Sequence, residues 1–307
     1  MNSPTCLAHN QSFARHDAFR CSTRPGDWRT KGRRRGRGPR SPLGSRRTGG
    51  HGAAIRPAAG NGNPLVAPFP SFPDNRFPFL KQTRGKFVVA YQHRYLEGDP
   101  LDLPVGKVVC IGRNYLDHIR ELNNAVPETP ILFMKPATAL LGLDEPIRLP
   151  VGQGECHHEV ELAVLVGRAL RDADAATAQN AVVGYGIALD LTLRDLQNEL
   201  KKKGHPWETA KAFDGSCPLS PFVKPGALAD PQATDLTLRI NGEPRQQGNT
   251  RLMMIGIFEL VAYISTHFTL QPGDVVLTGT PAGVGPLQSG DQLVLGLADR
   301  EFVARVA

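Results

Sequence analysis

The sequence lacks several features that define whole classes of protein. It has no run of about 18 apolar residues, so we expect no transmembrane helix and no membrane partner. Its five cysteines are an odd number without CxxC or zinc-ligand spacing, which argues against a structural zinc site. We interpret the cysteines in the body of the chain as small buried side chains in a reducing compartment, and we predict a cytoplasmic location.

Acidic residues are scarce in the N-terminal part. Residues 1–90 hold 17 of the 36 Lys and Arg residues but 3 of the 29 Asp and Glu residues, which gives this part a net charge of +14. Residues 91–307 hold the other 19 bases and 26 acids, a net charge of −7. The overall positive charge therefore does not describe the body of the chain. Nucleic-acid binding through the basic part, by unspecific charge attraction, is a distant alternative function.

Residues 1–89 also lack glutamate and any sustained hydrophobic period, and they are rich in Arg, Gly, Pro and Ser. Such composition predicts a disordered basic extension, because too little apolar surface is available to fold. A targeting segment and a start codon assigned too early are the alternatives. The last is favoured because ordinary protein-like sequence begins abruptly near residue 91. We place one folded domain over residues 90–307.

The folded part has many short strands and few helices, which predicts a β-dominated α+β fold rather than a doubly wound sheet. An Asn-Gly turn predicts a hairpin over 235–248. Asn114 is the expected N-cap of the first helix. Apolar runs and alternation predict strands at 105–112, 157–167, 184–192, 291–299 and 301–307, a strand or loop at 131–140, and a strand that runs into a Gly-rich loop over 274–285. Helical spacing predicts helices at 115–123, 193–203 and 253–268, the second of which is closed by Gly204.

Three acids stand in apolar strand-like runs. Glu159 and Glu161 are two residues apart, so on a strand they share a face about 6.6 Å apart. Asp190 closes another apolar run. Buried acids are costly unless something pairs with them, and neither run contains a basic residue. The pattern indicates a hard divalent cation, Mg²⁺ or Mn²⁺, bound through oxygen; solvated acids on an exposed face are the alternative.

Several other residues are candidates for chemistry. His118 and Glu121 are three apart on a predicted helix, where a carboxylate would fix the imidazole tautomer for a general base, although a surface pair gives the same pattern. Lys211 is a lone cation among small residues, either solvated or placed to stabilise an enolate. Pocket-lining candidates of the same kind are Lys135, Arg194, Gln197 and Thr280, the last in a Gly-rich loop that lacks a Walker ending.

Together these segments resemble the fumarylacetoacetate hydrolase family, in particular its acylpyruvate hydrolase and oxaloacetate decarboxylase branch. The resemblance covers about residues 91–307 and leaves residues 1–89 unmatched. The segments that carry it are GRNYLDH (112–118), FMKPATAL (133–140), HHEVELAVLVG (157–167), residues 189–218, INGEPRQQG (240–248) and LTGTPAGVGPL (277–287).

The resemblance implies a mixed β-sandwich roll and a homodimer. It assigns the metal ligands to Glu159, Glu161 and Asp190, and a dyad on a mobile lid to His118 and Glu121. It assigns the active-site lysine to Lys211. The remaining residues that it places at the substrate are Tyr115, Lys135, Arg194, Gln197 and Thr280.

The function that follows is an expectation. We hypothesise that the chain is a metal-dependent hydrolase of carbon–carbon bonds that cleaves 2,4-dioxo acids (acylpyruvates) to pyruvate and a carboxylate through a metal-stabilised enolate. In this hypothesis His118 and Glu121 activate water, and Lys211 holds the enolate. An oxaloacetate decarboxylase, or a related hydratase or isomerase of 2-oxo acids, is the alternative because it uses the same enolate.

Overall fold

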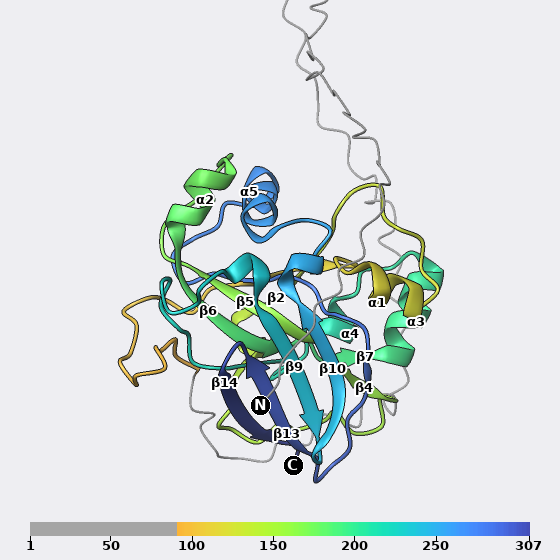
Figure 1. Ribbon diagram of the computed structural model, residues 1–307. Helices are drawn as coiled ribbons and strands as arrows, with labels where there is room; N and C mark the ends of the chain where they lie inside the picture. The colour runs from red at the N-terminus through yellow and green to blue at the C-terminus, as the bar shows by residue number, and fades with distance from the viewer. Residues whose placement is uncertain (1–90) are drawn as a thin grey trace, which may run out of the picture. The chain divides into compact units, whose positions relative to one another are not determined.

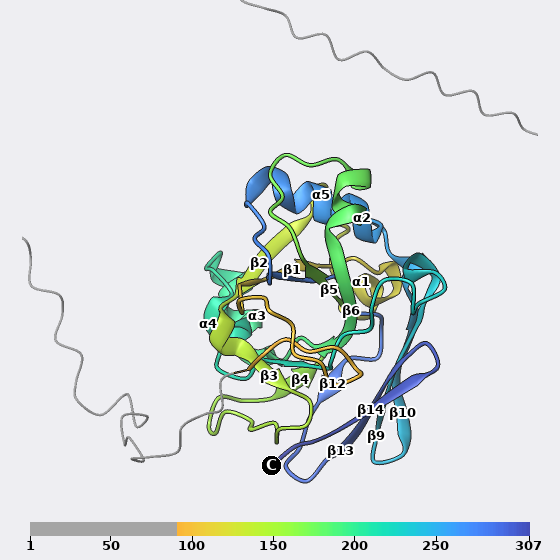
Figure 2. The ribbon, with the colours of Figure 1, turned by 90° about the vertical axis from the view of Figure 1, so that its left-hand side faces the viewer.

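The computed structural model describes residues 91–307 (Figures 1 and 2). The predictions made for residues 1–89 lie outside the described residues. No helix among residues 91–307 has the length and apolar character needed to cross a membrane. The predicted β-dominated α+β class is confirmed, because strands outnumber helices and form three sheets.

A seven-stranded mixed sheet lies at the centre (Figure 2). Two neighbouring pairs are parallel, β1 with β11 and β3 with β8, and the others are antiparallel. Every residue of β5 is buried, as expected for a central strand that is covered on both faces. The order across the sheet is β2 (Ile131–Lys135), β1 (Val108–Gly112), β11 (Val275–Leu277), β5 (Val160–Val166), β6 (Val182–Leu189), β8 (Cys217–Leu219) and β3 (Leu140–Gly142).

Two smaller sheets complete the strands. The predicted Asn-Gly hairpin is confirmed: Asn241 and Gly242 have φ values of 54° and 87°, as a type I′ turn requires. The antiparallel four-stranded sheet has the order β10 (Glu243–Asn249), β9 (Asp235–Ile240), β13 (Gln292–Leu297) and β14 (Arg300–Arg305). The three-stranded sheet has the order β12 (Gly285–Pro286), β4 (Cys156–His158) and β7 (Thr192–Leu193).

Two apolar clusters cover the two faces of the central sheet. The larger contains Val160 and Leu162 of β5 and joins them to the four-stranded sheet and to α5. The smaller contains Ala163 and Leu165. The predicted alternation along β5 is therefore confirmed. Each buried aliphatic side chain contributes about 1.5–3 kcal/mol to folding, so the register of β5 is strongly held and Glu161 cannot turn away from its face.

The helices lie around these sheets. α2 and α5 pack against each other at one end (Figure 1), and α3 packs against α4. Gly204, at φ 65°, ends α3 as predicted. The α-helices are α1 (Leu116–Glu121), α2 (Ala175–Ala181), α3 (Arg194–Lys203), α4 (Glu208–Lys211) and α5 (Ile257–His267), and the 3₁₀ helices are η2 (Ala137–Ala139), η3 (Pro231–Ala233) and η4 (Thr250–Leu252).

Two local predictions were wrong. The run 157–167 is not one strand, because β4 and β5 belong to different sheets and Glu159 lies at the break between them. Asn114 does not cap α1. Its side chain instead donates to the carbonyls of Ile255 and Thr278, and its Oδ1 accepts the Ile255 N–H. Asn114 thereby joins three distant segments beside the site described next.

Candidate active site

The three predicted metal ligands converge because β5 and β6 are neighbours. Val160 pairs with Leu189, and the Asp190 N–H donates to the Glu159 carbonyl at 2.8 Å. This register brings the residue after β6 beside the start of β5. One carboxylate oxygen from each of Glu159, Glu161 and Asp190 lies within 4.8 Å of the other two, and all three side chains are buried. The strands therefore place three acids around one point.

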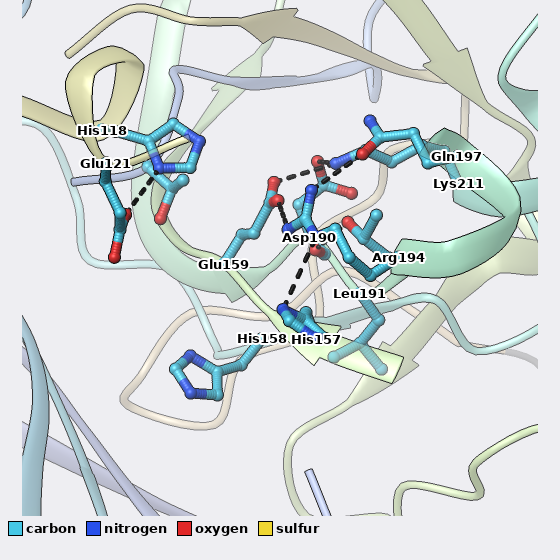
Figure 3. A network of polar contacts seen from close by, with 12 residues as sticks. His118, Glu121, His157, His158, Glu159, Asp190, Leu191, Arg194, Gln197 and Lys211 are labelled. Carbon is cyan, nitrogen blue, oxygen red and sulfur yellow. Dashed lines mark hydrogen bonds and ion pairs between the residues drawn. The ribbon is translucent and has the colours of Figure 1, made fainter. Parts of the chain in front are cut away.

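Cations from three other elements lie beside these acids, and Figure 3 shows two of them, Lys211 and Arg194, beside Glu159 and Asp190. Lys211 of α4 donates to Glu159 Oε2 at 2.9 Å and to Asp190 Oδ2 at 2.5 Å. Arg194 of α3 is hydrogen-bonded to the other oxygen of Glu159. Lys135 of β2 lies 2.8 Å from Asp190 Oδ1. Glu159 and Asp190 are therefore both paired with cations, which explains how these two buried acids are tolerated in this fold.

Two carboxylate groups nevertheless have oxygens without a hydrogen-bond donor among residues 91–307. Lys135 directs its hydrogens to the carbonyls of Lys211 and Ser216 and to the Ser216 hydroxyl, so Asp190 Oδ1 receives no hydrogen bond from residues 91–307 despite its charged neighbour. Glu161 has no cationic partner within residues 91–307, and its one recorded hydrogen bond comes from the Gly279 N–H at 2.6 Å. Such oxygens fit Mg²⁺ or Mn²⁺, which prefer carboxylate ligands.

The pKa values within the acid cluster also favour a bound divalent cation. Burial, followed by the charges of Asp190 and Glu159, raises the pKa of Glu161 well above its usual range. Burial also opposes ionisation of Glu159, but Lys211 and Arg194 outweigh it and lower that pKa. Burial would lower the pKa of Lys211, yet Asp190 and Glu159 outweigh it, so the pKa is raised and Lys211 is a permanent cation at neutral pH. A bound divalent cation would relieve the repulsion that Asp190 and Glu159 exert on the ionised form of Glu161.

Gly279 is required at its position for two reasons. Its φ of 95° is unfavourable for other residues, and a Cβ there would lie 2.7 Å from Asn114 Cβ. The turn directs its N–H to Glu161 and therefore fixes one face of that carboxylate. The Gly-rich loop that begins here thus serves the acid cluster and is more than a plain turn.

The predicted dyad lies on α1. His118 is buried, and its Nδ1 lies 3.2 Å from Glu121 Oε2. A carboxylate can only accept, so Nδ1 carries the proton and Nε2 is the basic nitrogen. Within residues 91–307, Nε2 has no hydrogen-bond partner. The second oxygen of Glu121 accepts the Gly283 N–H at 2.9 Å, which fastens α1 to the Gly-rich loop.

One small cavity joins His118 of the dyad to the acid cluster. Its volume is about 40 Å³, enough for only a few water molecules. Ten of its lining residues are His118, Glu159, Glu161, Asp190, Arg194, Gln197, Lys211, Thr280, Phe133 and Trp207. Gln197 accepts from Arg194 at 2.8 Å, and its amide nitrogen has no partner among residues 91–307. That nitrogen is available to a ligand.

Three residues expected at the substrate are placed differently. Lys135 is 0% exposed and lies behind Asp190 without lining the cavity, so it supports the acid. Tyr115 also does not line the cavity; its buried hydroxyl has no partner in the described part of the chain, and burial, followed by the charge of Glu161, raises its pKa. Thr280 lines the cavity, but its hydroxyl donates to the Val160 carbonyl at 2.8 Å and is not free to hold a substrate carboxylate.

Sequence reasoning missed Gln246, a buried residue of β10. Its Oε1 accepts from the Val160 N–H at 3.0 Å and from His158 Nδ1 at 2.8 Å. Its Nε2 donates to Thr280 Oγ1 at 2.8 Å and to the Pro281 carbonyl at 2.9 Å. Because Thr280 in turn donates to Val160, a closed ring of hydrogen bonds holds the residue between Glu159 and Glu161. No local signal in β10 reveals this role.

Two cavity-lining cations were also missed. Lys201 follows Arg194 and Gln197 at positions i, i+3 and i+7 of α3, so one helix face carries all three toward the cavity. That spacing was a usable signal. Arg113, the residue after β1, lines the cavity as well and has a left-handed φ of 64°. Its conformation could not be read from the sequence.

Comparison with known proteins identifies the family of the chain. The family model "Fumarylacetoacetate (FAA) hydrolase C-terminal" matches residues 107–305. The chain is 56% identical over 217 residues to oxaloacetate tautomerase YcgM of Escherichia coli, covering 70% of this chain and 99% of that protein. It is 46% identical over 190 residues to a mitochondrial oxaloacetate tautomerase of Homo sapiens, covering 62% of this chain and 86% of that protein.

A solved structure extends the comparison to a bound ligand. The crystal structure of fumarylpyruvate hydrolase from Pseudomonas aeruginosa in complex with Mn²⁺ and pyruvate is 33% identical to this chain. The alignment has a TM-score of 0.67 and covers 73% of this chain and 98% of that one. That relative therefore holds a divalent ion and a 2-oxo acid together.

Proposed function

Because the chain belongs to the fumarylacetoacetate hydrolase family, we propose that it is a metal-dependent enzyme that interconverts the keto and enol forms of oxaloacetate or a similar 2-oxo acid. One observation carries the proposal: a single small cavity is lined by a buried carboxylate triad, a permanent lysine cation and a histidine with a free ring nitrogen. The tautomerase relative, of which the chain covers nearly the whole length, supports this choice among the activities of the family.

Glu159, Glu161 and Asp190 would hold the ion. The unsatisfied Asp190 Oδ1 and the unpaired Glu161 are the structural reasons for this assignment. When bound, Mg²⁺ or Mn²⁺ acts as a Lewis acid that polarises the 2-oxo group and stabilises negative charge on its oxygen.

The residues of the chain supply the proton transfer. His118 Nε2 removes a proton from C3, the electron pair of the broken C–H bond forms the C2–C3 double bond, and the imidazolium returns the proton to the C2 oxygen. Glu121 holds the Nδ1 hydrogen, so Nε2 remains the base and the imidazolium is stabilised. Lys211 uses two of its hydrogens on Glu159 and Asp190 and has the third for the oxygen on which charge develops.

The cavity is small as it stands, about 40 Å³, and we propose that one wall moves to admit the substrate. The wall formed by α1 is the natural candidate, because this helix has six residues and several of its side chains are exposed. The hydrogen bond from the Gly283 N–H to Glu121 would then form when the helix closes and the dyad is in place.

Hydrolysis of acylpyruvates is the second candidate. The dyad favours it, since an imidazole backed by a carboxylate is suited to remove a proton from water. The water oxygen would bond to C4, the C3–C4 bond would break, and its electrons would give the enolate of pyruvate. Decarboxylation of oxaloacetate breaks the same bond without water. The Pseudomonas fumarylpyruvate hydrolase supports keeping this alternative.

A substrate panel tests the proposal. The purified full chain, loaded with Mg²⁺ or Mn²⁺ and compared with an EDTA-treated sample, is given oxaloacetate and acetylpyruvate. Loss of enol absorbance and release of pyruvate are followed separately. We expect tautomerisation of oxaloacetate to be the fastest reaction and to disappear with EDTA and in Glu161→Gln. Full activity in either condition would refute the proposal, and faster acetylpyruvate cleavage would favour the second candidate.

A homodimer, Mg²⁺ as the physiological ion and a cytoplasmic location are further proposals. The family resemblance supports the first two, and the cysteine usage supports the third. Light scattering tests the homodimer, and cell fractionation tests the location. Metal analysis of the protein purified from its native source tests the identity of the ion.

A further inference from the structure

Two cations that line the cavity take no part in holding the acid cluster. Arg113 follows β1, and Lys201 lies in the last turn of α3. Arg113 Nη2 and Lys201 Nζ both donate to Asn124 Oδ1, at 3.0 and 3.1 Å, and Arg113 Nη1 donates to the Ala125 carbonyl at 3.1 Å. All of these acceptors are neutral. Neither cation forms an ion pair within residues 91–307.

The charge of this pair is therefore unmatched. Lys135, Lys211 and Arg194 are already paired with Glu159 and Asp190, whereas Arg113 and Lys201 have no acid paired with them within residues 91–307. A divalent ion in the triad would make the cavity still more positive. One carboxylate and the 2-oxo oxygen of a substrate would face that ion, which leaves two positive charges without a partner elsewhere in the cavity.

The surroundings make this positive charge unfavourable as it stands. Burial lowers the pKa of Arg113. Burial, followed by the charges of Arg113 and Arg194, lowers the pKa of Lys201. The left-handed backbone of Arg113 is also unfavourable for a residue with a side chain, and such conformations cluster at ligand sites. An anion between the two side chains would relieve the repulsion.

We propose that Arg113 and Lys201, bridged by Asn124, form a subsite for the second carboxylate of a dicarboxylic 2-oxo acid. The proposal rests on the proposed function and narrows its substrate class. The subsite makes oxaloacetate-type acids better ligands than acids with a methyl group in place of the distal carboxylate. Because Arg113 and Lys201 both donate to Asn124 Oδ1, the two cations lie beside the same point.

The competing explanation is that both cations only fasten the loop that contains Asn124 and Ala125. Paired ligands separate the two ideas. L-malate and (S)-2-hydroxybutyrate share the 2-hydroxy acid group and differ only in a distal carboxylate against a methyl group. Their binding to the Mn²⁺-loaded full chain is measured by calorimetry, with the variants Arg113→Gln, Lys201→Gln and Asn124→Ala. Lys202→Gln is the matched control, because it removes the same charge from the adjacent exposed position of α3.

We expect wild type to prefer malate. Arg113→Gln and Lys201→Gln should each weaken malate binding by about 10- to 100-fold, as for a charged hydrogen bond, and change 2-hydroxybutyrate binding less than about threefold. Lys202→Gln should change neither, and Asn124→Ala should affect malate less than the two charge removals. If Arg113→Gln unfolds, Lys201→Gln at the helix end still decides the matter, with thermal unfolding as the check on folding.

Other outcomes overturn specific parts. If Arg113→Gln and Lys201→Gln weaken the binding of malate and of 2-hydroxybutyrate equally, the cations only fasten the loop. The same conclusion follows if Asn124→Ala weakens malate binding as much as these two variants do. An equal affinity of wild type for both ligands would exclude the subsite even if oxaloacetate is tautomerised. Clear preference for malate without any tautomerisation would leave the subsite standing and reject the proposed function.

Discussion

Replacing Gln246 by leucine should loosen the metal site without touching a metal ligand. The substitution removes all four hydrogen bonds of the side chain, two of them to groups beside Glu159. The Val160 N–H and the His158 Nδ1 hydrogen then lose their acceptor in the interior. Thr280 keeps its bond to the Val160 carbonyl but loses the donor that orients it. The backbone between Glu159 and Glu161 is thus held from one side only.

The magnitude follows from the two orphaned donors. A buried donor without a partner costs about 2 kcal/mol, so Gln246→Leu should lower the free energy of unfolding by about 4 kcal/mol. For a domain of this size that corresponds to a fall in Tm of roughly 8–16 °C. Groups that orient metal ligands typically contribute 10- to 100-fold to affinity, so we expect Mn²⁺ binding to weaken by about that factor.

Two measurements on the same preparation test this reasoning. Thermal unfolding gives the stability, and Mn²⁺ titration followed by electron paramagnetic resonance gives the affinity. Gln247→Leu is the control, because Gln247 is the exposed neighbour of Gln246 on β10 and should leave both values unchanged. A large fall in Tm with unchanged Mn²⁺ affinity would show that Gln246 supports the fold alone, and the positioning argument would be wrong.

Three further predictions concern other groups. Lys135→Met should destabilise the protein by about 3–5 kcal/mol in denaturant unfolding, because it removes one of the two lysines paired with buried Asp190 and leaves the carbonyls of Lys211 and Ser216 without this donor; a loss below about 1 kcal/mol would contradict this. Glu121→Ala should lower kcat about 100-fold or more without changing Mn²⁺ affinity; a weaker affinity would instead place Glu121 at the metal. Burial lowers the pKa of His93 below its ordinary 6.5, so the unfolded chain binds the proton more tightly. Stability linked to His93 is therefore present above pH 6.5 and is lost as the pH falls toward the folded pKa. His93→Gln should flatten the fall in Tm between about pH 7 and pH 5, and an unchanged slope would refute this role.

Much of the fold was predictable because its signals are local. The Asn-Gly turn, the Gly204 helix end and the alternation along β5 each depend on neighbours in sequence. The acid triad was predictable for a related reason, since Glu159 and Glu161 share a strand face and charged residues in apolar runs stand out. Asp190 needed one further inference, that the two apolar runs lie side by side, and the β5–β6 pairing supplies it.

The errors lie where distant segments decide the outcome. Asn114 has a side chain suited to cap a helix, but its amide instead donates to two carbonyls from distant segments, those of Ile255 and Thr278. Lys135 looks like a surface lysine before a proline, yet the carbonyls of Lys211 and Ser216 replace water around its ammonium group. Gln246 is a glutamine in an otherwise exposed strand. The partners of Asn114 lie at least 141 residues away, and the two carbonyls around Lys135 lie 76 and 81 residues away. The partners of Gln246 lie 34 to 88 residues away, so no local pattern registers any of these contacts.

The reactions open to this cavity share their demand for negative charge on a 2-oxo oxygen, so the triad and Lys211 cannot distinguish them. His118 can accept a proton from carbon or from water, and its own hydrogen bond to Glu121 is the same in both cases. The choice must therefore lie in what is held next to Nε2. If Arg113 and Lys201 bind the distal carboxylate, they fix the substrate along its length and set whether C3 or a water molecule faces that nitrogen. Substrate recognition far from the bond that reacts would then select the reaction, and neutralising Lys201 should change the ratio of tautomerisation to cleavage as well as the affinity.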